Sequence, residues 1–216
     1  MNMFCYQCEQ TARGTGCTER GVCGKDAATA RHQDLLLVAA QGVSQFAVRA
    51  RRLGAHDAAV DRFVIEALFS TVTNVNFDAA QLGTWIDRAI QVRDTARRLY
   101  EAACAAVGEA PELLTGPAVL ELKGTAADRL SLAASWGVAA RRTRRGDDLT
   151  GLEELVTYGL KGLAAYADHA LILGQTDDAV FAFVHETLDF LTSDRSSDEL
   201  TARALKVGEV NLRVME

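Results

Sequence analysis

The sequence predicts an all-α protein in which a cysteine-rich head precedes two copies of a three-helix unit. Only two of the 216 residues are proline, and Pro111 and Pro117 share one short stretch. Elsewhere Ala, Leu, Arg and Glu are abundant, and these residues lose little side-chain entropy in a helix. No segment shows the alternating apolar pattern of a strand. We therefore expect helices throughout the chain after its first 26 residues.

Composition and charge narrow the class of protein. Hydrophobic residues make up 49% of the chain and charged residues 24%, as in ordinary soluble globular proteins. The net charge of −6 argues against a nucleic acid or a membrane surface as the main partner. No stretch approaches the roughly 18 apolar residues that a membrane span needs. The start, residues 1–5, has neither a basic nor an apolar export signal, so we expect a cytoplasmic protein.

Three helices are predicted in the first part of the chain. Apolar residues recur at helical spacing in 33–53, and Gly54 can end this helix in a left-handed turn. A second helix is expected over about 57–74 and a long amphipathic third one over 78–107. We assign residues 27–107 to a first three-helix bundle.

A less regular segment, residues 108–148, connects this bundle to the rest. It contains both prolines, a plausible helix near 117–134 and the basic run 141–145. The basic run lacks interleaved aromatic residues and is followed by Asp147 and Asp148. We therefore expect a solvated loop or a contact between domains here, and not a nucleic-acid patch.

The pattern of the first helices then returns. When the sequence is shifted by 120, residues 154–189 align with 34–69 without a gap, and 13 of the 36 pairs are identical. The identical pairs cover helix caps as well as apolar positions, and they include Leu53 and Leu173, Gly54 and Gly174, Asp57 and Asp177, and Val60 and Val180. A third helix is expected again, over 197–215. Residues 149–216 are therefore predicted to form a second three-helix bundle by duplication.

Two glycines occupy matching positions inside the long helices of the repeat. Gly42 and Gly162 each cost about 1 kcal/mol relative to alanine in a helix interior. A matched cost in both copies predicts that helices approach each other closely at these points.

Four of the five cysteines lie in the irregular head, residues 1–26. They are spaced C-x2-C-x8-C-x5-C, at Cys5, Cys8, Cys17 and Cys23. The C-x2-C pair places two thiolates on one tight turn, and the glycine-rich spans that follow let the backbone wrap a larger inorganic core. The pattern favours an iron–sulfur cluster held by four thiolates.

Other interpretations of the cysteines stay open on spacing alone. Zinc sites also use four cysteines, but usually in two short knuckles, and here only one is short. A disulfide framework is disfavoured in a reducing compartment. Three basic residues of the head, Arg13, Arg20 and Lys25, offer charge compensation for a cluster or are simply solvated. Cys104 lies far along the chain and is expected to fill a gap in the core.

The histidines do not form a second site. His32, His56, His169 and His185 are scattered, and each is expected on a helix surface or as a core residue with its hydrogen bonds satisfied. His185 and Glu186 do not begin a zinc-protease motif, because Asp189 stands where the second histidine belongs.

Several segments resemble one known family. The segments are Met3-Phe4-Cys5-Tyr6-Gln7-Cys8-Glu9-Gln10-Thr11, Gly14-Thr15-Gly16-Cys17, Gly21-Val22-Cys23-Gly24-Lys25, Gln33-Asp34-Leu35-Leu36, Thr73-Asn74-Val75-Asn76-Phe77-Asp78 and Tyr158-Gly159-Leu160-Lys161-Gly162. Together they resemble the hybrid cluster proteins, also called hydroxylamine reductases, from the head to the last residue. The resemblance implies an N-terminal domain of two three-helix bundles, in agreement with the repeat.

The resemblance also implies a cofactor. The C-x2-C-x8-C-x5-C spacing is similar to the branch of the family that carries a [4Fe–4S] cluster, whereas the other branch has longer spans and carries [2Fe–2S]. The expected ligands of the cluster iron are Cys5, Cys8, Cys17 and Cys23.

In this family, electrons from an external redox donor protein are expected to enter at the head cluster. They would pass to a hybrid iron–sulfur–oxygen cluster in two α/β domains, where hydroxylamine is reduced to ammonia and water and nitric oxide is reduced in response to nitrosative stress. The present sequence stops about where the helical domain ends, and only Cys104 is left over. We therefore expect the α/β domains and the hybrid cluster to be absent, and the isolated chain to have no catalytic residue and no activity.

This interpretation leaves two alternatives. One is a complete small iron–sulfur protein that senses redox state or nitric oxide. The other is a helical scaffold held together by zinc. Under the main interpretation, the partners are the external donor and the missing domains of the same enzyme, with no nucleic acid and no membrane.

Overall fold

The computed structural model describes residues 3–122 and 125–216, which form eight α-helices, two short 3-10 turns and no strand longer than an isolated bridge. The helices are α1 (Ala27–Arg52), α2 (Ala58–Ser70), α3 (Ala79–Val107), α4 (Ala126–Trp136), α5 (Val138–Arg145), α6 (Asp147–Ile172), α7 (Asp178–Phe190) and α8 (Ser197–Met215), and the 3-10 turns are η1 (Ala12–Gly14) and η2 (Gly116–Val119). The predicted all-α class is confirmed. Residues 1–2 of the expected head and 123–124 of the expected connecting segment lie outside the described residues.

The duplication is visible in the bounds of the helices. α1 and α6 each have 26 residues, α2 and α7 each have 13, and both pairs are offset by 120 positions. Asp57 and Asp177 cap α2 and α7 through their side chains, since each carboxylate accepts a backbone N–H of the first turn. Only the third helices differ, because α3 has 29 residues and α8 has 19.

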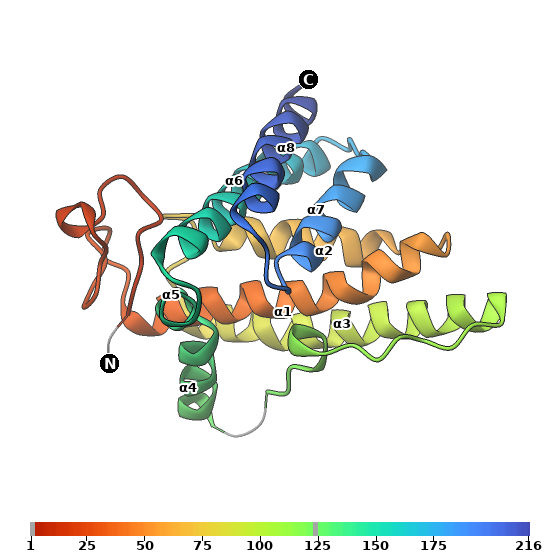
Figure 1. The fold of residues 1–216 in the computed structure, drawn as a ribbon, viewed down its shortest axis with the longest axis horizontal. Helices are drawn as coiled ribbons and strands as arrows, with labels where there is room; N and C mark the ends of the chain where they lie inside the picture. The colour runs from red at the N-terminus through yellow and green to blue at the C-terminus, as the bar shows by residue number, and fades with distance from the viewer. Residues whose placement is uncertain (1–2, 123–124) are drawn as a thin grey trace.

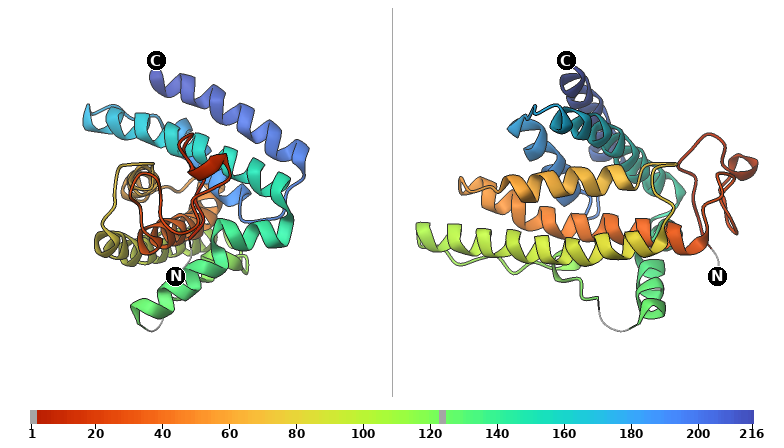
Figure 2. Two further views of the ribbon diagram at one scale, coloured as in Figure 1. Left: turned by 90° about the vertical axis from the view of Figure 1, so that its left-hand side faces the viewer. Right: turned by 180° about the vertical axis from the view of Figure 1, so that it is seen from behind.

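The first helix is the centre of the molecule. α1 packs against α2, α3, α4 and α7, and α6 packs against α2, α5 and α8. A helix that is surrounded by partners needs apolar residues on most of its faces, and most positions of α1 between Leu35 and Ala50 are buried. One continuous apolar core therefore includes residues of both three-helix units. The head lies beyond one end of α1, shown in red at the left of Figure 1 and from two further sides in Figure 2.

Within residues 3–122 and 125–216, no helix is both long enough and apolar enough to cross a membrane.

The boundaries proposed above for the head, the two bundles and the connecting segment stay predictions.

The structure differs from the predicted elements in the connecting segment. The basic run is not a loop, because α5 extends from Val138 to Arg145. Its guanidinium groups explain the helix, since Arg141, Arg142 and Arg145 all pair with carboxylates of α6 or of the segment after α7. The helix expected near 117–134 begins later, as α4, and residues Gly116–Val119 form the short 3-10 turn η2 instead.

The ends of two predicted helices also move. α1 begins at Ala27 and not near residue 33, because the side chain of Asp26 accepts the backbone N–H of Thr29 and caps the helix earlier. α2 ends at Ser70 and not near Asn74. Asn74 has φ = 66°, which is the left-handed conformation and is incompatible with a continuing helix.

The prediction for the two helix glycines is half right. A Cβ atom on Gly42 would lie 2.3 Å from the carbonyl oxygen of Pro117, so the backbone approach is close, but the neighbour is η2 and not a helix. A Cβ atom on Gly162 would meet nothing within 4 Å, so the expected close contact there is wrong. The close approach in the second unit occurs one turn earlier, where a Cβ on Gly159 would lie 2.9 Å from Val207 Cγ1 of α8.

Candidate metal centre in the cysteine head

Two of the four head cysteines are held side by side by the backbone. The N–H of Cys5 donates to the carbonyl oxygen of Cys17 at 3.1 Å, and the N–H of Cys17 donates to that of Cys5 at 2.7 Å. Met3 extends the pairing through its N–H to the Thr18 carbonyl at 3.0 Å. These bonds form a two-stranded bridge that brings together cysteines twelve positions apart in sequence.

A tight turn holds the fourth cysteine. The N–H of Gly21 donates to the carbonyl of Lys25, and the N–H of Gly24 donates to the carbonyl of Gly21, both at 2.8 Å. A Cβ atom on Gly21 would lie 3.0 Å from Cys23 Sγ, so the sulfur rests against the glycine backbone. Glycine thus lets the Cys23 sulfur approach the backbone more closely than a residue with a Cβ atom would.

Backbone and hydroxyl donors surround the sulfur of Cys17. The N–H of Ala12 lies 3.4 Å from Cys17 Sγ, and the Thr11 hydroxyl lies at 3.7 Å. The same threonine donates to the Cys5 carbonyl, and its own N–H donates to the Cys8 carbonyl at 3.2 Å. The turn that begins at Cys8 therefore returns the chain to the Cys5–Cys17 bridge.

These donors change the acidity of the thiols. Burial raises the pKa of Cys17, but the N–H groups of Ala12 and Val22 and the Thr11 hydroxyl outweigh it, so the pKa is lowered. Burial raises the pKa of Cys5, and here the Lys25 and Lys161 charges oppose the effect without overcoming it. The environment of Cys17 is thus built for a thiolate, which is the form that binds metal.

The head offers sulfur ligands with hydrogen-bond donors around them. In the described part of the chain, no three His, Cys, Asp or Glu side chains converge closely enough to hold one metal ion. Four thiolates are the usual ligand set of an iron–sulfur cluster. N–H groups directed at a ligand sulfur are also the usual second contacts of such clusters. The donor set of the head therefore fits a cluster of several irons.

Aromatic rings anchor the head to the helices. Phe4 and Tyr6 meet edge to face at 5.1 Å, and Tyr6 meets Tyr158 of α6 at 6.2 Å. The guanidinium of Arg142 lies over the Phe4 ring at 4.6 Å and also binds both carboxylate oxygens of Asp147. This cation–π contact joins the head to α5, at the run of arginines for which the sequence predicted a solvated loop or a contact between domains.

Polar side chains form a second anchor. Gln7 Nε2 and Lys161 Nζ both donate to the Thr71 carbonyl at 3.4 Å. Lys25 Nζ donates to Gln33 Oε1 at 2.6 Å, and Gln33 Nε2 continues to the Asn76 carbonyl at 3.0 Å. The head is therefore bonded to α1 and to the segment between α2 and α3, and Lys161 of α6 donates to the same carbonyl as Gln7.

A layer of buried charges lies where the head meets the helices. Lys161 and Glu154 of α6 are buried, and Arg141 of α5 forms a short ion pair with Glu154. Burial and the charge of Glu154 raise the pKa of Asp34 in α1 to about 7, against the opposing charges of Arg141, Lys161 and Lys25. Burial likewise raises the pKa of Tyr6 to about 12.

Sequence reasoning identified only part of this charged layer. Three residues were candidates for charge compensation. Arg13 and Arg20 are exposed to solvent, whereas Lys25 is buried. Lys161 was quoted in the Tyr158–Gly162 motif without a role. A lysine between the apolar positions Leu160 and Leu163 is a signal that could have singled it out.

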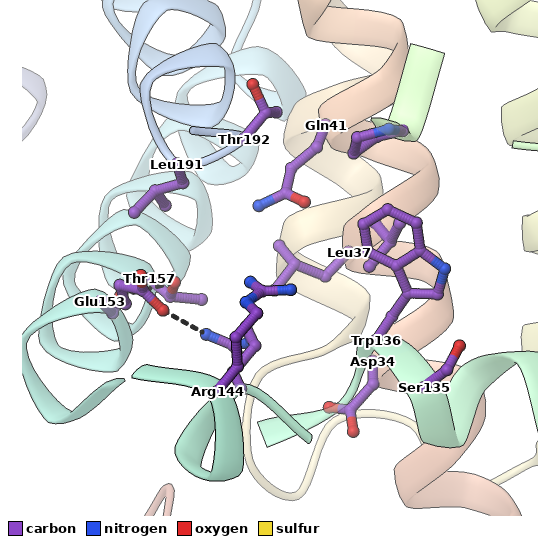
Figure 3. Close-up of a pocket in the computed structure, with 13 residues that line it drawn as sticks. Asp34, Leu37, Gln41, Ser135, Trp136, Arg144, Glu153, Thr157, Leu191 and Thr192 are labelled. Atoms are coloured by element: carbon purple, nitrogen blue, oxygen red, sulfur yellow. Dashed lines mark hydrogen bonds and ion pairs between the residues drawn. The ribbon is translucent and has the colours of Figure 1, made fainter. Parts of the chain in front are cut away.

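A small polar cavity borders the charged layer. Its volume is about 60 Å³, enough for a few water molecules. Asp34 and Gln41 reach it from α1, Trp136 from α4, Arg144 from α5 and Glu153 from α6 (Figure 3). In this cavity Asp34 shares the lining with the charged residues Arg144 and Glu153, and the volume is too small for most organic substrates.

The residues that were set apart from the metal site stay apart in the structure. Cys104 is 1% exposed inside α3, within the apolar core beside Tyr100. His185 is also 1% exposed, and its two ring nitrogens contact Ser44 and Asp61. Neither residue belongs to the head.

Comparisons with known proteins were made for the whole sequence. Residues 3–216 match the model of the Prismane/CO dehydrogenase family. A hydroxylamine reductase of Rhodospirillum rubrum is 48% identical over 215 residues, which are 99% of this chain and 39% of that protein. Those of Acidithiobacillus ferrooxidans and Methanocella arvoryzae are 44% and 40% identical, again over 99% of this chain and 39% of theirs. The chain thus spans about two fifths of the length of these curated relatives.

Proposed function

This chain belongs to the Prismane/CO dehydrogenase family, and from that premise we propose that it is the N-terminal iron–sulfur electron-transfer part of a hydroxylamine reductase. The family expected from the head motifs and the helical repeat is thereby confirmed. The proposed cofactor is a [4Fe–4S] cluster, and the proposed ligands are Cys5, Cys8, Cys17 and Cys23.

The observation that carries the proposal is the environment of Cys17. Its sulfur accepts an N–H from Ala12, and its backbone pairs with that of Cys5 in both directions. These contacts hold two thiols next to each other and favour the ionised form of one of them. Cys104, by contrast, lies in the apolar core, where its side chain contacts the Tyr100 hydroxyl.

When bound, an iron–sulfur cluster supplies one-electron transfer at a potential set by its surroundings. The role of this chain is to position the thiolates that would hold the cluster. Gly21 lets the backbone lie against Cys23 Sγ, and Thr11 fixes the turn between Cys8 and Cys17. The Phe4–Tyr6–Tyr158 rings attach the segment around Cys5 to α6.

In this proposal the substrate step belongs to the part of the relatives that the 216 residues do not match. That step is NH2OH + 2e⁻ + 2H⁺ → NH3 + H2O, with nitric oxide as a second candidate substrate. The external electron donor and the other domains of the enzyme are the proposed partners.

Anaerobic purification followed by iron, sulfide and zinc analysis tests the proposal. We expect about four irons and four sulfides per chain and a brown protein. Two irons would contradict the [4Fe–4S] assignment, and one zinc without iron would contradict the proposal altogether.

Matched cysteine variants test the ligand set. Cys17→Ala is expected to lose the iron, whereas Cys104→Ala is expected to keep it, since the latter side chain is in the core of α3. Equal iron loss in both variants would show that cluster content follows folding and not ligation. The chain is also expected to show no hydroxylamine turnover with a reduced dye, and measured turnover would contradict the division of roles.

A further inference from the structure

Two lysines are buried beneath the cysteine head, although lysine is rarely buried without a charged partner. Lys25 is 2% exposed and Lys161 is 7% exposed. Lys206 of α8 is an ordinary surface lysine by contrast, with a side chain that is 50% exposed and paired with Glu209. Burial of an ammonium group costs several kcal/mol unless nearby groups compensate for it.

The hydrogen-bond partners of both buried lysines are neutral. Lys25 Nζ donates to the Gln33 amide oxygen at 2.6 Å, and Lys161 Nζ donates to the Thr71 carbonyl at 3.4 Å. Neither ammonium forms an ion pair with a carboxylate among the described contacts, which cover residues 3–122 and 125–216.

The carboxylates of the same layer compensate for the lysines only in part. Burial lowers the pKa of Lys161, and Glu154 opposes this effect more than any other charge, but Glu154 also forms an ion pair with Arg141. Asp34 also acts on Lys161, yet its pKa of about 7 leaves a large fraction of it uncharged near neutral pH. The lysines therefore leave positive charge under the head without a matching anion.

Both lysines are tied to the segment that carries the cysteines. Lys161 Nζ and Gln7 Nε2 donate to the same Thr71 carbonyl oxygen, and Gln7 lies between Cys5 and Cys8 in the sequence. Lys25 belongs to the head itself, two residues after Cys23, and is bonded to Gln33 of α1. The negative charge that would compensate for the two lysines is therefore expected from the cysteine thiolates of the head.

We propose that Lys161, together with Lys25, is a positioning charge that holds electron density at the four-cysteine site and raises its reduction potential. The inference rests on the proposed function, because it needs a redox group bound by Cys5, Cys8, Cys17 and Cys23. One added electron increases the negative charge of the ligated group, and a buried cation stabilises the more negative state more strongly than the less negative one. The two lysines thereby favour reduction and balance their own burial.

The test is the reduction potential of the purified chain, measured by an electron paramagnetic resonance titration. Lys161→Gln removes the charge but keeps a donor for the Thr71 carbonyl, and Lys161→Met keeps the apolar stem and removes both. We expect each to make reduction at least tenfold less favourable, a shift of about 59 mV to lower potential for one electron. Lys206→Met removes an exposed charge of the same kind and is expected to leave the potential unchanged.

Rescue separates charge from structure. Lys161→Arg keeps the positive charge and is expected to keep a potential close to that of the unmodified chain. A Lys161→Gln chain that is folded by circular dichroism but has lost its iron also supports the inference if Lys161→Arg keeps the iron. Loss of iron from both variants would overturn it, because a cation would then not suffice.

Failure of this inference is distinguishable from failure of the proposed function. If the unmodified chain carries iron and sulfide and Lys161→Gln has the same content and the same potential, the role of Lys161 is refuted and the proposed function stands. If the unmodified chain binds no iron at all, both are refuted together.

Discussion

His185 Nε2 lies 2.9 Å from Asp61 Oδ1, and the two residues belong to opposite halves of the repeat. The other ring nitrogen of His185 contacts the Ser44 hydroxyl at 2.9 Å, and Arg51 binds the second oxygen of Asp61 at 2.6 Å. All three groups around the ring are buried or nearly so. α1, α2 and α7 are therefore joined by one polar network inside the shared apolar core.

The network explains why the two units form one core. In the alignment of the repeat, the counterparts of Asp61 and His185 are Phe181 and Ile65, which are apolar. His185 of the second unit thus finds both of its partners, Ser44 and Asp61, in the first unit. Since an unsatisfied buried polar group is costly, the network selects one way of packing the two units together.

We expect Asp61→Asn to lower the free energy of unfolding by about 1–3 kcal/mol, because Arg51 and the buried His185 ring lose a buried carboxylate partner. Urea denaturation followed by circular dichroism measures the change. Asp178→Asn is a matched control, since Asp178 binds the same guanidinium at 2.7 Å but its side chain is 65% exposed. That substitution is expected to cost less than about 1 kcal/mol, and equal losses would contradict the role of burial.

The acidity of Asp34 predicts how stability changes with pH. Its pKa is raised from 3.8 to about 7 in the folded state, so between these values the folded chain holds a proton that the unfolded chain has released. Stability from this group is therefore lost as pH rises from about 4 through 7. Asp34→Asn cannot ionise, and its stability is expected to fall less between pH 5 and pH 8.

Urea midpoints at the two pH values measure this difference. Asp147→Asn is the control, because Arg142 lowers the pKa of that exposed carboxyl. The stability of this variant is expected to change between pH 5 and pH 8 as much as that of the unmodified chain. If the stability of Asp34→Asn changes by the same amount as well, Asp34 is not the group responsible.

Replacing the two helix glycines by alanine is expected to change the stability of the domain in opposite directions. Gly42→Ala places a Cβ atom 2.3 Å from the Pro117 carbonyl oxygen, so backbone must move and the domain is destabilised. Gly162→Ala meets nothing within 4 Å and gains helix propensity, up to about 1 kcal/mol. Thermal denaturation of both variants gives the comparison, and a neutral Gly42→Ala would contradict the close approach.

The Arg142–Phe4 contact predicts how firmly the head is held. Arg142→Ala removes the guanidinium from the Phe4 ring and is expected to make the head several-fold more sensitive to limited proteolysis, while the helices stay intact. Arg144→Ala, an exposed neighbour on the same helix, is the control and is expected to leave the rate unchanged. Mass spectrometry of the first cleavage products locates the cuts, and cleavage outside the head would argue against this anchor.

Features that depend on neighbours in sequence were predictable. Apolar spacing, the caps Asp57 and Asp177, and the duplicated register specify the long helices, because these signals act within one helix or turn. The cysteine spacing likewise marks the head as a ligand set. The errors arose where a distant group decides, as at η2, which approaches Gly42, and at α5, whose arginines pair with carboxylates of α6 and of the segment after α7.

The sequence by itself determined the helical class, the repeat and the four candidate thiolates. Only the tertiary structure decided that Lys161 lies beneath the head, that Asp34 shares its layer, and that His185 meets Asp61. The physical reason is that periodicity sets which face of a helix is apolar, whereas the fate of a polar residue on that face depends on which helix packs against it. Lys161 and His185 occupy such faces, and their partners come from other parts of the chain.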